Sequence, residues 1–291
     1  MLTRLTTPLR SALGRLLPRR AAPHLPRLDL RGQTIAPEEL ADRIARQSVL
    51  VDLDAADCRL MHLLAFPATP ESGHPLIATT RGLIAGNVTG YDGSPLARWF
   101  DRIRPQSAAE VLDLNLPAGH ALRAMPANQA QLPWAGLSGP KVAAVRVNRK
   151  ADESRDPHAP FHVFGGPYPR TDGIARVTRL AGLIDAIRRE GYSPERHDNF
   201  MTAEMLVGAD GRAAFRIMGG QHRTSTLVAL GITRFAVHIK AGRVRRLRDA
   251  ANWPAPRAGA LSLEQAQTVF RRMLQGGQPG YVRAHWPGAE E

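Results

Sequence analysis

Two adjacent glycines, a glutamine, a histidine and an arginine follow one another from Gly219 to Arg223, and hydroxyl residues come next. Glycine lets the backbone approach a ligand closely. The apolar run before this turn predicts a strand, and the run that ends at Gly231 predicts a short helix. Free N–H groups at the start of a helix attract anions. The candidate anion-binding residues are therefore Gly219, Gly220, Gln221, His222, Arg223, Thr224 and Ser225.

The composition of the chain favours anionic partners. Its 291 residues carry a formal net charge of +13, mostly from arginine, and include a single cysteine, Cys58. Nucleic acid, phosphate esters and acidic lipids all suit this charge, although a GC-rich genome also enriches arginine. One cysteine excludes an intramolecular disulfide and agrees with a reducing compartment. No apolar run approaches the roughly 18 residues that cross a bilayer, so we expect a cytoplasmic protein.

Residues 1–28 form a basic segment of their own, in which six arginines precede the first acidic residue, Asp29. Leucines recur there at spacings of three and four, which predicts a basic amphipathic helix interrupted at Pro8 and ended at Pro18. Such a helix can lie on the inner face of an anionic membrane or contact a partner, and transit peptides have a similar composition. A disordered basic tail is the alternative interpretation.

Residues 29–150 predict an α+β region of unassigned role. A strand is expected at 48–53, and a second apolar run lies at 75–78. Proline and acidic residues at the start of a helix, or a serine followed three residues later by glutamate, mark helix N-termini. On these signals helices are expected to begin at Pro37, Pro95 and Ser107. Residues 116–140, rich in proline, glycine and alanine, are expected to form a loop or linker.

Residues 155–275 predict a second domain, preceded by a strand at 142–147 and followed by a tail at 276–291. An amphipathic helix is expected at 174–189, ended by Gly191. Asp210-Gly211 predicts a hairpin between the strands 204–207 and 213–218. A strand at 233–239 and a capped helix at 262–273 complete the domain, so the fold class is mixed α/β (α+β).

The order helix, hairpin, glycine turn, helix and strand over 174–239 resembles the ParB/sulfiredoxin superfamily, which includes the ParB-like nuclease domain. Gly219-Gly220-Gln221-His222-Arg223 is similar to the sulfiredoxin turn Gly-Gly-Cys-His-Arg and to the Asp-Gly-His-His-Arg turn of free-serine kinases in this superfamily. The resemblance covers about 65 residues closely and about 100 loosely. It implies a ParB/sulfiredoxin-like domain at 155–275 that binds a nucleoside triphosphate, ATP or CTP with Mg²⁺, through His222 and Arg223.

Two departures from the superfamily pattern bear on the reaction. Gln221 stands where sulfiredoxin has its catalytic cysteine, so thiol-dependent reduction of sulfinic acids is not expected. Gly219 stands where the kinase-like members have aspartate, so a phosphotransferase would need another acid to hold Mg²⁺ and orient the acceptor. Among the acids nearby in sequence, Asp185, Glu190, Glu204 and Asp210, we favour Glu190 as the catalytic residue.

Three hypotheses on function follow. The first is a nucleotide-binding protein acting as an ATP-dependent phosphotransferase on a small-molecule or sugar hydroxyl; stand-alone chains with this turn resemble ones associated with bacterial surface-polysaccharide genes. The second is a ParB-like CTP- or ATP-sensing module that contacts DNA or a partner without turnover. The third is a non-catalytic scaffold with a vestigial site, in which the glycine turn is purely structural.

Two further patterns add to these hypotheses. The arginines between 243 and 248 can meet phosphate, nucleic acid or membrane, or can form a solvated basic face. His158 and His162 have helical ligand spacing, but prolines at 157 and 160 oppose a helix there, so we do not expect a zinc site. Only about 50 residues follow the predicted nucleotide module, which leaves little room for a DNA-reading domain.

Overall fold

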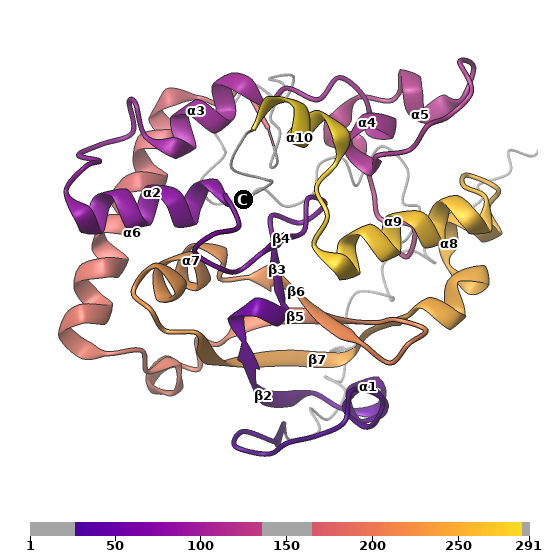
Figure 1. Cartoon of the computed structure of the whole chain (residues 1–291). Coiled ribbons are helices and arrows are strands. Elements are labelled where there is room, and N and C mark those ends of the chain that lie inside the picture. The colour runs from indigo at the N-terminus through magenta and orange to yellow at the C-terminus, as the bar shows by residue number, and fades with distance from the viewer. Residues whose placement is uncertain (1–26, 136–164, 287–291) are drawn as a thin grey trace, which may run out of the picture.

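A seven-stranded mixed sheet organises the protein in the computed structural model, which describes residues 27–135 and 165–286 (Figure 1). The strand order is β1-β2-β7-β5-β6-β3-β4. The fold is therefore mixed α/β, as the sequence predicts. The strands are β1 (Leu28–Asp29), β2 (Val49–Asp54), β3 (Cys58–Leu60), β4 (Phe66–Pro67), β5 (Met201–Val207), β6 (Ala213–Gly219) and β7 (Arg234–Arg246).

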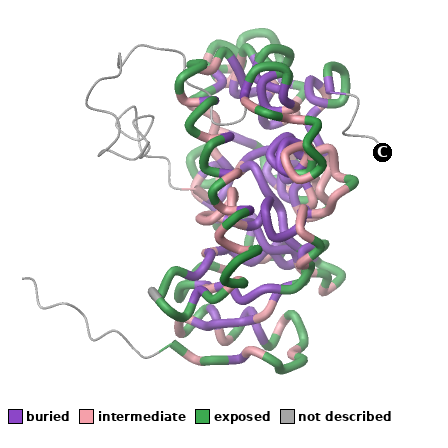
Figure 2. The backbone as a smooth tube through the Cα atoms, turned by 90° about the vertical axis from the view of Figure 1, so that its left-hand side faces the viewer, coloured by how far each residue is buried: buried purple, intermediate pink, exposed green. Residues whose placement is uncertain are grey.

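Strands from both predicted regions belong to this one sheet. β2 pairs antiparallel with β7, and β3 pairs parallel with β6, so strands far apart in sequence are hydrogen-bonded neighbours. Most of the buried apolar side chains form a single core cluster that spans both regions. Figure 2 shows buried backbone running through the middle of the molecule, with exposed residues outside it. The division predicted near residues 150–155 thus does not separate two sheets or two cores.

Helices flank the sheet. In Figure 1, α2, α3 and α10 lie above the strands, α6 and α7 lie to their left, and α1 lies below β7. Contacts join α7 to α2 and to α6. The helices are α1 (Pro37–Arg46), α2 (Pro75–Ala85), α3 (Pro95–Arg102), α4 (Ala108–Leu112), α5 (Ala121–Ala124), α6 (Arg170–Glu190), α7 (Gln221–Ala229), α8 (Pro254–Arg257), α9 (Leu263–Gln275) and α10 (Gly280–His285), with 3₁₀ turns η2 (Ala55–Asp57), η3 (Ala127–Gln129), η4 (Pro194–His197) and η5 (Leu247–Asn252).

Capping residues set the helix ends where the sequence predicts them. The Ser262 hydroxyl accepts the N–H of Gln265, whose side chain accepts the N–H of Ser262, so the capping box of α9 is confirmed. The Ser107 hydroxyl likewise accepts the N–H of Glu110 at the start of α4. Gly191 ends α6 with a φ of 73°. The capping signals therefore locate these termini correctly.

Several expectations need correction. The apolar run at 75–78, for which no element was predicted, opens helix α2, because His74 caps it and Pro75 occupies its first position. Residues 116–140 are not loop throughout, since α5 and η3 lie within them. The expected tail at 276–291 contains α10, whose apolar side chains pack into the core. The predictions for residues 1–26, for the strand at 142–147 and for the histidines 158 and 162 lie outside the described residues.

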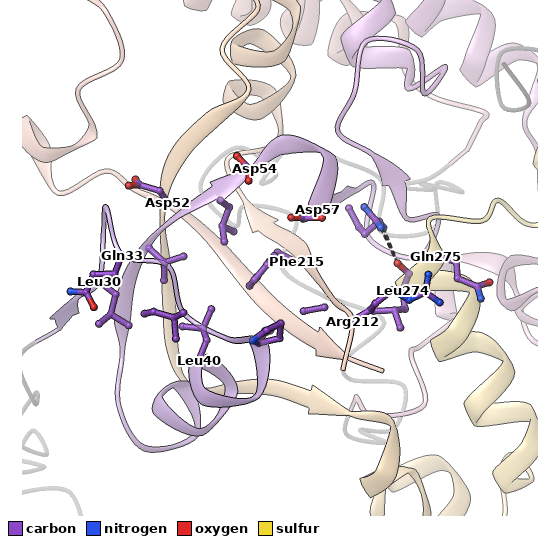
Figure 3. Close-up of a pocket in the computed structure, with 17 residues that line it drawn as sticks. Leu30, Gln33, Leu40, Asp52, Asp54, Asp57, Arg212, Phe215, Leu274 and Gln275 are labelled. Atoms are coloured by element: carbon purple, nitrogen blue, oxygen red, sulfur yellow. Dashed lines mark hydrogen bonds between the residues drawn. The ribbon is translucent and has the colours of Figure 1, made fainter. Parts of the chain in front are cut away.

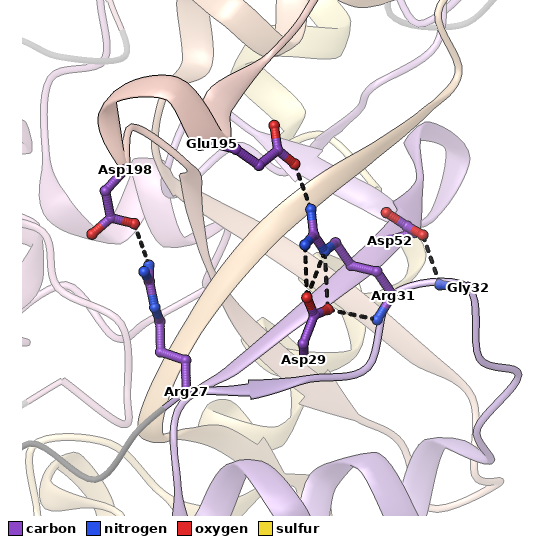
Figure 4. Close-up of polar contacts among 7 residues, drawn as sticks. All are labelled: Arg27, Asp29, Arg31, Gly32, Asp52, Glu195 and Asp198. Carbon is purple, nitrogen blue, oxygen red and sulfur yellow. Dashed lines mark hydrogen bonds and ion pairs between the residues drawn. The ribbon is translucent and has the colours of Figure 1, made fainter.

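Ion pairs tie the edge strand β1 to the turn η4 (Figure 4). Arg27 bonds to Asp198, and Arg31 bonds to Glu195 and to Asp29. The Arg31 guanidinium lowers the pKa of Asp29 through this hydrogen bond. Asp52 of β2 accepts the N–H of Gly32 at 2.9 Å, which secures the loop that follows β1. These contacts hold a two-residue edge strand that has few ladder bonds of its own.

The described helices include none that is both long and apolar enough to cross a membrane.

Candidate functional site

The glycine turn leads from β6 into α7 and leaves the first helical amides without intrahelical acceptors. Gly220 is the N-cap residue of α7 and has a φ of +92°. The first intrahelical bond runs from the N–H of Thr224 to the carbonyl of Gly220 at 2.9 Å. The N–H groups of Gln221, His222 and Arg223 precede that bond, so they form the positive end of the helix dipole.

A cavity of about 220 Å³ lies beside this turn. Its polar lining comes from the turn itself, from α6 and from the loop after β3. The described lining includes two histidines and an arginine but no carboxylate. The lining residues are Met61, His62, Leu76, Leu96, Phe100, Arg176, Met218, Gly220, Gln221 and His222. An anion in this cavity would meet positive charge and N–H donors, with no acidic side chain to repel it.

The imidazoles of the site are neutral. Burial, followed by the charges of Arg176 and Arg179, lowers the pKa of His222 to about 3. Burial, followed by Arg216 and Arg176, lowers the pKa of His62 to about 4. The Nε2 atom of His222 is buried and has no hydrogen-bond partner among the described residues. Because a buried polar atom without a partner is costly, His222 is poised to bond a ligand.

A third buried histidine, His74, caps α2 and interacts electrostatically with His222. Its Nδ1 accepts the N–H of Ile77 at 3.4 Å, so its Nε2 carries the proton of the neutral ring. That Nε2 is also buried and has no partner among the described residues. Burial, and then the neighbouring His222, lowers the pKa of His74 to about 3. The histidines around the turn are therefore neutral at physiological pH.

Arg176 supplies the guanidinium of the cavity. It lies on α6 over the ring of Tyr168, with its Cζ 5.0 Å from the ring centroid, and its Nε donates to the Tyr168 hydroxyl. Tyr168 in turn stacks on Phe100 at 4.1 Å between ring centroids. This aromatic support fixes the direction of a long side chain, which would otherwise lose rotamer entropy on binding a ligand.

Gln221 holds two parts of the site together. Its Oε1 accepts the N–H of Met61 at 3.2 Å, and its Nε2 donates to the carbonyl of Ile217 at 3.3 Å. Met61 and His62 both have positive φ, so this loop is bent sharply next to the turn. Gln221 thus positions the loop that carries His62.

The other predicted site residues lie around the turn but do not line the cavity. Arg223 donates to the carbonyl of Asn199, and the Thr224 hydroxyl bonds to Gly220 O and to the Met201 sulfur. Gly219 ends β6 beside Thr202, while the Ser225 hydroxyl is buried with no partner among the described residues. Of the seven predicted residues, three line the cavity: Gly220, Gln221 and His222.

The favoured catalytic acid, Glu190, is outside this lining. It is exposed at the end of α6 and pairs with Arg189 at 2.6 Å, which lowers its pKa. Glu204 is a different kind of acid: its side chain is 1% exposed and pairs with Arg216 at 2.7 Å and Arg245 at 3.1 Å. Burial alone would raise the pKa of Glu204, but the two guanidinium charges outweigh burial and lower it.

The basic run at 243–248, which lies mostly within β7, is largely occupied by pairing within the chain. Arg245 points to Glu204, while Arg246 bonds to Asp42 at 2.5 Å and to Glu38 at 3.1 Å on α1. Arg248 lies 3.6 Å from Glu38. Successive strand residues point to opposite faces, so the run ties elements on both sides of β7.

Comparison of the chain with protein-family models, with curated proteins and with solved structures found no match.

Replacement of Gly220 by valine is expected to destabilise the protein by about 2–4 kcal/mol. A Cβ at Gly220 would lie 2.6 Å from Cγ of Met201, and the φ of +92° is strained for any residue with a side chain. Gly182→Ala is the matched control, because a Cβ there meets open space on α6 and should stabilise the helix by about 0.5–1 kcal/mol. Urea unfolding measures both. A valine variant as stable as wild type would show that the turn tolerates a side chain.

Proposed function

We propose that the turn at Gly220 binds the phosphate groups of a nucleotide or of a small phosphorylated molecule. One observation carries this proposal: Arg176, His62, His222 and the N-terminus of α7 converge on one cavity whose described lining has no carboxylate. A helix N-terminus and a guanidinium are the donors that phosphate prefers. The order β6, glycine turn, α7 and β7 also supports a ParB/sulfiredoxin-like arrangement of this part of the chain.

The size of the cavity indicates which part of the ligand it holds. About 220 Å³ is below the roughly 300 Å³ at which pockets for whole organic ligands begin. The cavity therefore suits the phosphates, and the sugar and base of a nucleotide would lie outside it. On this proposal the turn itself discriminates only weakly between ATP, CTP and GTP.

Mg²⁺ would reach this site on the phosphates. Among the described residues, no group of three His, Cys, Asp or Glu side chains could hold a metal ion. Mg²⁺ is commonly held through phosphate oxygens and water with only one or two carboxylates, and it would neutralise phosphate charge there. We therefore propose binding as the function, and phosphoryl transfer as the hypothesis that a turnover assay tests, with release of ADP as the readout.

The experiment is calorimetric titration of the full chain with ATP, CTP, GTP and tripolyphosphate, each with and without Mg²⁺. Tripolyphosphate lacks sugar and base, so we expect it to bind with an affinity within about tenfold of the nucleotides, a difference of about 1.4 kcal/mol. Binding of nucleotides without any binding of tripolyphosphate would move the recognition away from the turn. No binding of any of the four would overturn the proposal.

Arg176→Ala is expected to weaken tripolyphosphate binding about 10- to 150-fold, because a charged hydrogen bond to phosphate contributes about 1.5–3 kcal/mol. Arg188→Ala removes the same charge from an exposed position further along α6 and should leave the affinity within about threefold. Arg223→Ala should also have the smaller effect, because Arg223 bonds to Asn199 instead of lining the cavity. A larger loss in Arg223→Ala than in Arg176→Ala would restore the contact that the sequence predicts.

A further inference from the structure

A second cavity, of about 550 Å³, is larger than the one beside the turn and lies elsewhere on the sheet (Figure 3). It is bounded by the loop after β1, by α1, by β2 and by the end of α9. Its volume falls in the range of about 300–1,000 Å³ that small-molecule sites occupy. Nothing in the glycine turn or in the proposed phosphate site accounts for it.

The floor of this cavity is apolar. Val51 of β2, Met205 of β5 and Phe215 of β6 contribute side chains from three strands, and Leu40 and Leu274 close the cavity from α1 and α9. Met205 and Phe215 are partners in the β5–β6 register, so they lie on one face of the sheet. Glu204 and Arg216 precede and follow them in the strands and project from the opposite face, so the Glu204 ion pairs do not reach this floor.

Three aspartates, Asp52, Asp54 and Asp57, lie along one side of the cavity (Figure 3). Asp52 accepts the N–H of Gly32, and Asp54 lies 3.4 Å from Arg234. Asp57 forms no ion pair or side-chain hydrogen bond with the other described residues. Asp52 and Asp54 alternate with Val51 and Leu53 along β2, so Asp57 is the carboxylate closest in direction to a ligand on the apolar floor.

The two arginines of the lining offset the charge of these aspartates only in part. Arg59 directs its guanidinium to backbone carbonyls, bonding to Leu274 at 2.9 Å and to Ala56 at 2.7 Å. Arg212 pairs with Asp210 at 2.6 Å. Asp57 is partly exposed to solvent, and burial of the rest, only partly offset by Arg59, raises its pKa. A cation in the cavity would favour the ionised carboxylate.

We propose that this cavity binds a small organic cation, a primary amine or guanidine on an apolar body, with the body on Met205 and Phe215 and the cation facing Asp57. The apolar floor argues against a bare metal ion, and the described residues include no group of three ligands that could hold one. The aspartates repel anions, so this ligand differs in class from the phosphate compound proposed for the turn. Failure of one of the two binding proposals would therefore leave the other unaffected.

The test is titration of the full chain with three probes that share one body: 4-phenylbutylamine, 4-phenylbutan-1-ol and 4-phenylbutanoate. We expect the amine to bind at least tenfold more tightly than the alcohol, a difference of about 1.4 kcal/mol, and the carboxylate to bind least. Equal affinities for all three, or no binding of the amine at millimolar concentration, would overturn the proposal.

Two variants locate the binding. Asp57→Asn should bring the affinity for the amine down to that for the alcohol while leaving the alcohol unchanged. Asp101→Asn is the matched control, because it removes one exposed carboxylate on α3 that does not line the cavity. Ala213→Phe places a ring in the cavity and should abolish binding of both probes. If the amine binds equally well to wild type, Asp57→Asn and Ala213→Phe, it binds elsewhere and the proposal is wrong.

Discussion

Replacement of Glu204 by alanine is expected to lower the free energy of unfolding by about 3–5 kcal/mol. The Glu204 carboxylate accepts hydrogen bonds from Arg216 at 2.7 Å and from the indole N–H of Trp134 at 3.0 Å, and it pairs with Arg245 at 3.1 Å. The Arg216 side chain is only 8% exposed. Without the carboxylate, its charge would remain buried and uncompensated, which is the costly half of a buried ion pair. Urea unfolding at neutral pH measures the loss.

Two comparisons separate charge from packing in this prediction. Glu190→Ala removes the same side chain from an exposed pair with Arg189, so its effect should be much smaller. The double variant Glu204→Met with Arg216→Met removes the buried pair together and should recover most of the lost stability, because apolar replacements of buried pairs are often neutral. If Glu204→Ala costs no more than Glu190→Ala, the arginines around Glu204 do not depend on it.

The sequence contains a signal for this pair. Asp210-Gly211 predicts a hairpin, and the structure pairs Ala203 with Ile217 and Glu204 with Arg216 across it. Counting outward equally from Asp210 would place Glu204 opposite Arg216. The dipeptide predicts the hairpin, but from sequence alone Glu204 is only one of several acids near it. The contribution of Arg245 and Trp134 has no comparable signal, because both come from elements outside the hairpin.

Local signals predict much of the secondary structure and little of the sheet. Capping residues and prolines locate α1, α3, α4 and α9, because these signals act within one helical turn. The parallel pairing of β3 with β6 depends on contacts between segments far apart in the chain. β3 has three residues, too few for an alternating pattern to show. The union of both predicted regions in one sheet was therefore beyond the sequence pattern.

The sequence likewise predicts some residues of the candidate site and not others. Gly220, Gln221 and His222 are predicted because the anion site begins with a local feature, a glycine turn before a helix. His62 carries no sequence signal, since it lies in a bent loop that Gln221 holds against the turn. Arg176 is identifiable as a polar residue of α6, but its direction toward the cavity depends on packing against Tyr168. Only tertiary packing brings the N-terminus of α7, His62 and Arg176 together around the cavity.

Acidification from about pH 6.5 to about pH 5 is expected to destabilise the protein by about 4 kcal/mol per pH unit. The pKa is lowered to about 4 for His62 and to about 3 for His74 and His222, mainly by burial. In this window the unfolded chain binds protons at these three side chains and the folded chain does not. The effect is already reduced to half of this slope at pH 6.5 and vanishes above about pH 7.5, where both states are neutral at these residues. Carboxylates in the unfolded chain titrate near pH 4, below this window.

Urea midpoints and slopes measured at several pH values across this window test the prediction. His74→Ser keeps a capping oxygen for α2 but removes one titrating group, so it should reduce the pH dependence by about one third. His285→Gln, at an exposed position on α10, is the matched control for the loss of an imidazole. A stability that stays constant from pH 6.5 to pH 5 would show that these histidines are protonated in the folded protein.

The same neutral imidazoles make anion binding depend on protons. An anion beside His222 favours the imidazolium, so its pKa rises in the complex and binding takes up a proton. Sulfate is the suitable probe, because its own charge stays constant from pH 8 to pH 5. We expect sulfate affinity to increase as the pH falls, and His222→Gln to remove most of that increase. If the affinity is independent of pH in wild type, the anion contacts Arg176 and the amides of α7 without touching the imidazole, and His222 is a structural residue.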